Sequence, residues 1–188
     1  MEDKIKSIIR DSASATEKLA ENAGEIAEAV EMMAQAIEGG RKILLFGNGG
    51  SAADSQHIAA ELIGRFKITR PALCAIALTT NTSSITAISN DFGYDEVFAR
   101  QIEGLGKEGD VAIGISTSGK SKNVIEAVVK AKAKALKVIT LTGRDPGPLG
   151  ELADISIAVP AGDTPRIQEL HILTGHIICE LLDERLFG

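Results

Sequence analysis

The chain has 188 residues, of which 44% are hydrophobic and 24% charged, and its formal net charge is −6. That length suits one domain with a full hydrophobic core, and an acidic balance without any lysine- or arginine-rich run argues against a nucleic-acid partner. Only 3% of the residues are aromatic and none is tryptophan, which disfavours stacking platforms for bases or sugar rings.

The cysteines and the N-terminal residues bear on the cellular compartment. Cys74 falls in an apolar run and Cys179 on a predicted helix, without metal-type or disulfide-type spacing, so both are expected to be buried, reduced thiols. The opening residues, MEDKIKSIIRDS, lack the apolar centre of a signal peptide, and no apolar run approaches the length of a membrane span. We therefore expect a cytoplasmic protein without a membrane partner.

A helical pattern occupies the N-terminal part of the chain. Apolar residues recur there in alternating steps of four and three, at Leu19, Ala23, Ile26, Val30, Met33 and Ile37. Gly24 is a candidate break between two helices. The stripe packs either on the chain's own core or against a second subunit, and we favour the second because so long a stripe precedes the first strand. Residues 1–40 are thus expected to form a helical extension for oligomer packing.

From residue 41 to residue 188 the pattern predicts an α/β core. Short apolar runs that end in polar or glycine-rich turns predict strands at 42–47, 72–78, 110–116, 137–143 and 155–160. Helical patterns lie between and after them, at 52–65, 82–90, 95–104, 122–135 and 165–186. Continuous apolar strands that alternate with helices indicate a five-stranded parallel sheet flanked by helices on both faces.

Two turns that follow predicted strands are rich in glycine and small polar residues. The first, called here the glycine loop, is Gly47-Asn48-Gly49-Gly50-Ser51, and the second, the serine loop, is Ser116-Thr117-Ser118-Gly119-Lys120-Ser121. In a parallel sheet, ligands bind where the carboxyl ends of strands lead into helices. Glycines let backbone N–H groups approach an anion, and a helix N-terminus adds its positive dipole end. Four hydroxyls in the serine loop exceed what helix capping requires, so this loop is predicted to bind an anion.

The glycine loop also fits the dinucleotide pattern G-x-G-x-x-A, through Gly47, Gly49 and Ala52. That function needs an acidic residue at the end of the second strand to bind ribose hydroxyls. The second predicted strand ends in Ala-Leu-Thr-Thr (77–80), without Asp or Glu. A nucleotide cofactor is therefore not expected.

Two helices carry polar side chains among apolar ones. His57 and Glu61 are four residues apart, so their side chains can meet on one helix face behind the glycine loop. A local ion pair is the ordinary explanation, but this position favours a role in a pocket. On the last helix, Gln168 and His176 are about 80° apart, and they are either structural or reach a site. His171 is about 140° from His176, so one site is not expected to use both.

Four segments in fixed order and spacing carry a resemblance to a known family. They are GNGGSAADSQHIAAEL (47–62), NDFGYDEVFARQ (90–101), STSGKSKNV (116–124) and RIQELHILTGH (166–176). Over essentially its whole length the chain resembles the phosphoheptose isomerases, sugar-isomerase (SIS) domain proteins that interconvert sedoheptulose 7-phosphate and D-glycero-D-manno-heptose 7-phosphate. The combination of motifs is specific, whereas the SIS fold alone also hosts regulators and transferases.

The resemblance implies an enediol mechanism with Glu61 as catalytic base and His176 as its partner across the site. It implies contacts to the sugar or its phosphate, the phosphate being held by the serine loop, at Asn48, Gly49, Gly50, Ser51, Glu61, Asn90, Asp91, Ser116, Thr117, Ser118, Ser121 and Gln168. It also implies a homotetramer whose sites draw on neighbouring subunits, and a zinc site at His57, Glu61, Gln168 and His176. Glutamine is a poor zinc ligand, and a carboxylate committed to zinc is a weaker base, so the two roles of Glu61 compete.

Two other functions fit the same features. The DnaA-initiator-associating protein, a relative of these isomerases, keeps the fold and tetramer but acts by binding a protein. Because Glu61 and His176 are both present here, with His57 and Gln168, the enzyme is favoured. An isomerase or sensor for another phosphosugar is the second alternative, since phosphate recognition is indifferent to the number of carbons behind it.

Overall fold

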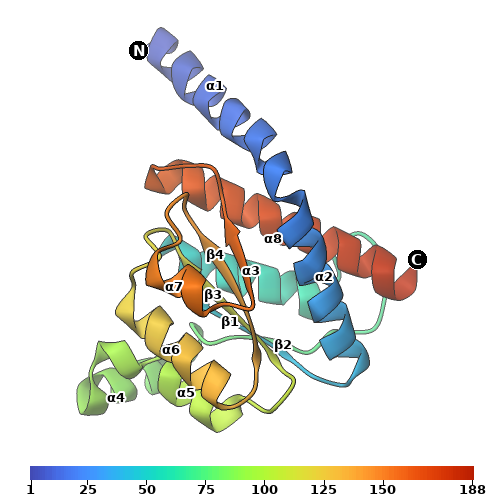
Figure 1. Ribbon diagram of the computed structural model, residues 1–188, viewed down its shortest axis with the longest axis vertical. Helices are drawn as coiled ribbons and strands as arrows, with labels where there is room; N and C mark the ends of the chain where they lie inside the picture. Colours follow the sequence, from blue (N-terminus) through green and yellow to red (C-terminus); the bar gives the residue numbers. More distant parts are fainter.

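Five parallel strands form the centre of the computed structural model, which describes residues 1–188 (Figure 1). The strands are β1 (Ile43–Gly47), β2 (Ala75–Ala77), β3 (Val111–Ser116), β4 (Lys137–Thr142) and β5 (Ile155–Ala158), in the spatial order β2-β1-β3-β4-β5. Each strand lies within its predicted range, so the predicted α/β fold with a five-stranded parallel sheet is confirmed.

Helices cover both faces of this sheet. One face packs against α2 (Ala23–Glu38), α3 (Gly50–Ile63) and α8 (Thr164–Phe187) in a core cluster of 29 buried residues. The other face packs against α5 (Ala99–Leu105), α6 (Lys122–Ala133) and α7 (Gly147–Leu152) in a cluster of 14. The strands β1 and β3 are buried along their whole length, because side chains on both of their faces point into one of these clusters. The remaining elements are α4 (Thr82–Phe92) and the 3₁₀ helix η2 (Tyr94–Glu96).

The N-terminal stripe packs on the chain's own core. Leu19, Ile26, Val30 and Met33 are buried in the cluster that α2 shares with α8. The preference for a second subunit is therefore wrong for these residues, because α8 already covers them. The break between helices lies in the 3₁₀ turn η1 (Leu19–Asn22), just before Gly24 rather than at it.

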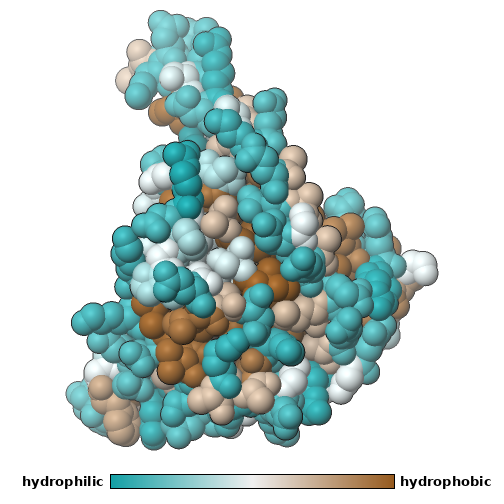
Figure 2. Space-filling model, viewed as in Figure 1, coloured by the Kyte–Doolittle hydropathy of each residue, from teal (hydrophilic) through white to brown (hydrophobic).

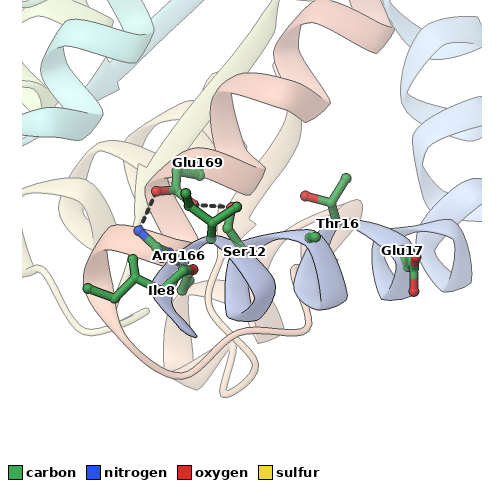
Figure 3. Close-up of a pocket in the computed structure, with 8 residues that line it drawn as sticks. Ile8, Ser12, Thr16, Glu17, Arg166 and Glu169 are labelled. Atoms are coloured by element: carbon green, nitrogen blue, oxygen red, sulfur yellow. Dashed lines mark hydrogen bonds and ion pairs between the residues drawn. The ribbon is translucent and has the colours of Figure 1, made fainter. Parts of the chain in front are cut away.

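Helix α1 (Glu2–Lys18) has no buried residue and extends away from the sheet (Figure 1). Its surface is mainly hydrophilic with scattered apolar side chains (Figure 2). Ile5 and Ile9 are among the exposed large apolar residues of the chain. Polar contacts fix one side of α1 to the start of α8 (Figure 3). Ser12 Oγ donates to Glu169 Oε2 at 2.8 Å, and Arg166, which pairs with Glu169, donates to the carbonyl of Ile8 at 3.1 Å.

Two further expectations need correction. Helix α7 was not predicted, because its glycine-rich sequence GPLGEL resembles a turn. Pro146 and Pro148 lie at its start, and the side chain of Leu149 is buried in the core.

Cys74 is exposed just before β2 rather than buried, since that strand begins only at Ala75. Cys179 is buried as expected, and burial raises the pKa of its thiol to about 12. No helix has the length and apolar content needed to cross a membrane.

Candidate active site

The glycine loop connects β1 to α3 at the carboxyl end of the sheet. Gly49 has a φ of +57°, which favours glycine, and a Cβ on Gly47 would lie 2.8 Å from the carbonyl oxygen of Ile115. The loop therefore passes tightly over β3 before α3 begins. Of its predicted site residues, Ser51 is buried, whereas Asn48 remains partly accessible and Gly50 exposed.

The serine loop lies between β3 and α6. Ser116 Oγ is 2.9 Å from Ser121 Oγ and 3.5 Å from Ser118 Oγ, so three of the four predicted hydroxyls converge before the first turn of α6. Gly119 has a φ of +64°, and a Cβ there would lie 2.1 Å from the carbonyl oxygen of Pro146. The backbone at the start of α7 thus packs closely against the serine loop. Hydroxyl donors at a helix N-terminus suit a phosphate group.

A second cluster lies where α3 and α8 run side by side. His57 Nε2 is 3.2 Å from Glu61 Oε1 and 3.2 Å from His176 Nε2, and the ring of His176 stacks on Phe66 with 5.5 Å between centroids. The expected contact between His57 and Glu61 is thus present, and α8 adds His176 to it. The side chain of Glu61 is 27% exposed and that of His57 47%, so solvent or a ligand can reach both.

These three side chains have the chemistry and spacing of a metal site. Their ligand atoms all lie within 4.8 Å of one another. Two ligands of a tetrahedral zinc ion, each about 2.1 Å from the metal, are about 3.4 Å apart. The 3.2 Å distances from His57 Nε2 to Glu61 and to His176 are close to this value. Two imidazoles and a carboxylate are a known catalytic zinc ligand set.

Other predicted site residues lie on α8 and α4. Gln168 lies over the start of α3, since a Cβ on Gly50 would be 2.2 Å from its Nε2. Asn90 and Asp91 are exposed on the last turn of α4, where Asn90 Nδ2 donates to Asp91 Oδ1 at 2.8 Å. Glu61 follows Gly50 by eleven residues, about 16 Å of axial rise, so the histidine–glutamate cluster and the loops lie toward opposite ends of α3.

His171 is separate from the site, as its angle on α8 predicted. It is completely buried, its Nε2–H donates to the carbonyl of Thr142 at 3.1 Å, and its Nδ1 has no partner. Burial lowers the pKa of His171 to about 4, and the hydrogen bond to Thr142 opposes part of this shift. The His171 ring is therefore neutral in the folded protein at neutral pH.

This burial predicts a loss of stability in acid. Above pH 6.5 the His171 ring is neutral in both states. Between pH 6.5 and about 4 the unfolded chain binds a proton that the folded chain does not, and about 3 kcal/mol is lost across that window. Urea unfolding of the wild type and of His171→Gln at pH 7.5 and 4.5 measures the effect. The wild type should lose more stability than the variant by roughly this amount, and equal losses would contradict the prediction.

Three residues at the site were not selected from the sequence. Asn123 and Tyr94 contact Asn48. Both lie within the family-like segments 116–124 and 90–101, and nothing else in the sequence marked them as site residues. Asp54, one turn before His57 on α3, is half-buried, and its Oδ2 has no hydrogen-bond partner. Burial raises the pKa of Asp54 to about 6, and the neighbouring His57 opposes this. Its helical spacing from His57 was the available signal.

The parallel sheet with a hydroxyl-rich loop at its carboxyl edge defines a SIS-domain protein, and the SIS domain family matches residues 9–143. A phosphoheptose isomerase from Geotalea daltonii is 51% identical over 189 residues, covering 100% of this chain and 98% of the relative. The phosphoheptose isomerase structure from Neisseria gonorrhoeae has a TM-score of 0.92 at 44% identity, covering 97% of this chain and 98% of that one. The phosphoheptose isomerase structure from Francisella tularensis has a TM-score of 0.93 at 40% identity, covering 97% of this chain and 97% of that one. The chain belongs to the phosphoheptose isomerase family.

Proposed function

We propose that this protein is an aldose–ketose isomerase that converts sedoheptulose 7-phosphate into D-glycero-D-manno-heptose 7-phosphate through an enediol. The observation that carries this function is the contact of Glu61 with His57, beside His176, in a chain that matches phosphoheptose isomerases over its full length. A carboxylate beside imidazoles provides the general base and general acid that proton transfer between neighbouring carbons requires. A protein that acts only by binding another protein would not need these catalytic groups, so the isomerase is favoured.

Recognition of the substrate is divided between phosphate contacts and sugar contacts. The hydroxyls of the serine loop, Ser116, Thr117, Ser118 and Ser121, bind the phosphate. The sugar is contacted by Asn48, Gly49, Gly50, Ser51, Asn90, Asp91 and Gln168. The convergence of three hydroxyls at the start of α6 supports the first assignment, and the position of Gln168 over Gly50 supports its place in the second.

Glu61 is the base that takes a proton from C1 of the ketose and returns it to C2, so that the enediol becomes an aldose. His176 is the general acid that serves the carbonyl oxygen or the ring oxygen. Both groups are accessible and lie at one side of α3 and α8, which supports a joint role. Hydrogen bonds to the oxygen that gains charge in the enediol then lower the barrier.

His57, Glu61 and His176 would hold a zinc ion, with Gln168 as the predicted fourth ligand. The 3.2 Å spacings support the first three, whereas the role of Gln168 stays a prediction. Lewis-acid polarisation of the substrate's hydroxyl–carbonyl pair is the chemistry that bound zinc supplies. Because a metal-bound carboxylate is a weaker base, we assign the essential role to base catalysis and an accessory role to metal.

The proposed setting is a homotetramer in the cytoplasm. The part of the 1–40 extension that is free to pack against another copy is α1, which exposes Ile5 and Ile9. An apolar groove at its end is lined by residues that include Ala20 and Leu173. The 16 Å separation along α3 supports sites shared between subunits. Two unpaired cysteines suit a reducing compartment.

Metal removal separates the roles of base and zinc. Purified protein is incubated with sedoheptulose 7-phosphate, with and without chelator, and the aldose product is followed by NMR. We expect turnover to survive chelation with less than a tenfold loss. Loss on chelation and recovery with zinc would move the metal into the essential mechanism. Fructose 6-phosphate in a parallel reaction tests for another phosphosugar, and we expect it to turn over far more slowly.

A further inference from the structure

A partly buried pair of amide side chains joins the two loops of the site. Asn123, in the first turn of α6, is only 3% exposed. Its Nδ2 donates to Asn48 Oδ1 at 2.8 Å, and Asn48 Nδ2 donates back to Asn123 Oδ1 at 2.8 Å. Each side chain therefore satisfies a donor and an acceptor of the other across 75 residues of sequence.

A third segment completes the arrangement around Asn48. Tyr94, in η2 after α4, donates its hydroxyl hydrogen to Asn48 Oδ1 at 3.0 Å. A carboxamide oxygen has two lone pairs, and both are then occupied, by Asn123 and by Tyr94. Of the four hydrogen bonds that the Asn48 amide can make, the one left open is its second N–H.

We propose that Asn123 is a positioning residue that, together with Tyr94, fixes the amide of Asn48 so that it offers a single N–H to an oxygen of the sugar. The inference rests on the proposed function, which assigns a sugar contact to Asn48. It extends that function to two residues outside the predicted site.

The pair also sets the spacing between sugar and phosphate contacts. Asn123 follows Ser121 of the serine loop by two residues, whereas Asn48 belongs to the glycine loop. A hydrogen-bonded link between them holds the two loops at a fixed separation. A substrate bound by both loops gains from this link, whereas inorganic phosphate, bound by the serine loop alone, does not.

The test is a double-mutant cycle with kcat/KM as its readout. We expect Asn123→Ala to lower kcat/KM for sedoheptulose 7-phosphate by about tenfold to a hundredfold, since a displaced contact of this kind has that size of effect. In an Asn48→Ala background the same change should cost less than threefold, because the group that Asn123 positions is gone. Binding of inorganic phosphate should change less than threefold.

Gln101→Ala provides the matched control. The Gln101 amide also makes two hydrogen bonds, to the carbonyls of Leu78 and Val97, but outside the site. It should lower the Tm to a similar extent and leave kcat/KM unchanged. If Asn123→Ala resembles this control, or if its effect is the same with and without Asn48, the residue is only structural and the inference is overturned.

An NMR readout keeps this inference distinct from the proposed function. In ¹⁵N-labelled wild type, the side-chain amide proton of Asn48 that bonds to Asn123 should be protected from exchange, and Asn123→Ala and Tyr94→Phe should each shift the Asn48 amide signals. Unchanged signals would overturn the inference even in an active enzyme. Inactivity of the wild type on sedoheptulose 7-phosphate, with shifted signals, would reject the proposed substrate and retain the fixed amide.

Discussion

Glu61→Gln is expected to lower kcat by about a thousandfold while the protein remains folded. General base catalysis contributes about 10² to 10⁴ in rate, and a glutamine of the same shape accepts no proton from carbon. The side chain of Glu61 is partly exposed and pairs only with His57, so its replacement leaves no buried charge without a partner. Product formation followed by NMR, with thermal unfolding in parallel, measures both parts of the expectation.

Glu103→Gln is the matched control for that change. Glu103 lies on α5 in surface ion pairs with Arg100 and Lys130, away from both loops, and its variant should retain full turnover. Inorganic phosphate should bind Glu61→Gln as it binds the wild type, because the serine loop is unaltered. Wild-type turnover by Glu61→Gln would show that another group moves the proton.

Arg70→Ala should have the largest effect on stability, a loss of about 3–5 kcal/mol in the free energy of unfolding. Arg70 Nε is 2.7 Å from Asp183 Oδ1, and the two side chains are 1% and 3% exposed. The guanidinium also donates to the carbonyls of Glu61 and Leu62 at the end of α3. Removing it leaves the buried Asp183 carboxylate without its charge partner, with only the backbone N–H of Lys67 still donating to it, and takes a donor from the carbonyl of Glu61. Urea unfolding should detect this loss.

A neighbouring ion pair makes the comparison direct. Lys67 pairs with Glu180 between the same loop and the same helix, but these side chains are 58% and 40% exposed. Lys67→Ala should therefore cost less than about 1 kcal/mol. Similar losses for the two variants would mean that burial does not decide the strength of these pairs.

Local patterns in the sequence predicted much of the fold and part of the site. The strands were identified because their apolar runs are continuous, and the contact of His57 with Glu61 because four residues make one helical turn. The serine loop was identified from the density of its hydroxyls. Roles for individual residues came only from resemblance to a family.

Features that depend on distant segments were not predictable in the same way. Asn48 and Asn123 are 75 residues apart, and Arg70 and Asp183 are 113 apart, so nothing local to either partner marks the contact. The stripe of α2 was assigned to the wrong partner for the same reason, since periodicity shows that a face is buried and not what covers it. Helix α7 was missed because local composition opposed it, and packing of Leu149 outweighs that preference.

Isomerisation of sedoheptulose 7-phosphate in D₂O, followed by ¹H NMR, tests the central claim most directly. We expect D-glycero-D-manno-heptose 7-phosphate to accumulate with deuterium at C2, because a proton held on Glu61 exchanges with solvent. Glu61→Gln is expected to form the product and to incorporate deuterium about a thousandfold more slowly than the wild type. Absence of an aldose heptose phosphate with the wild type, under chelated and zinc-loaded conditions alike, would contradict the assignment of this protein as a phosphoheptose isomerase.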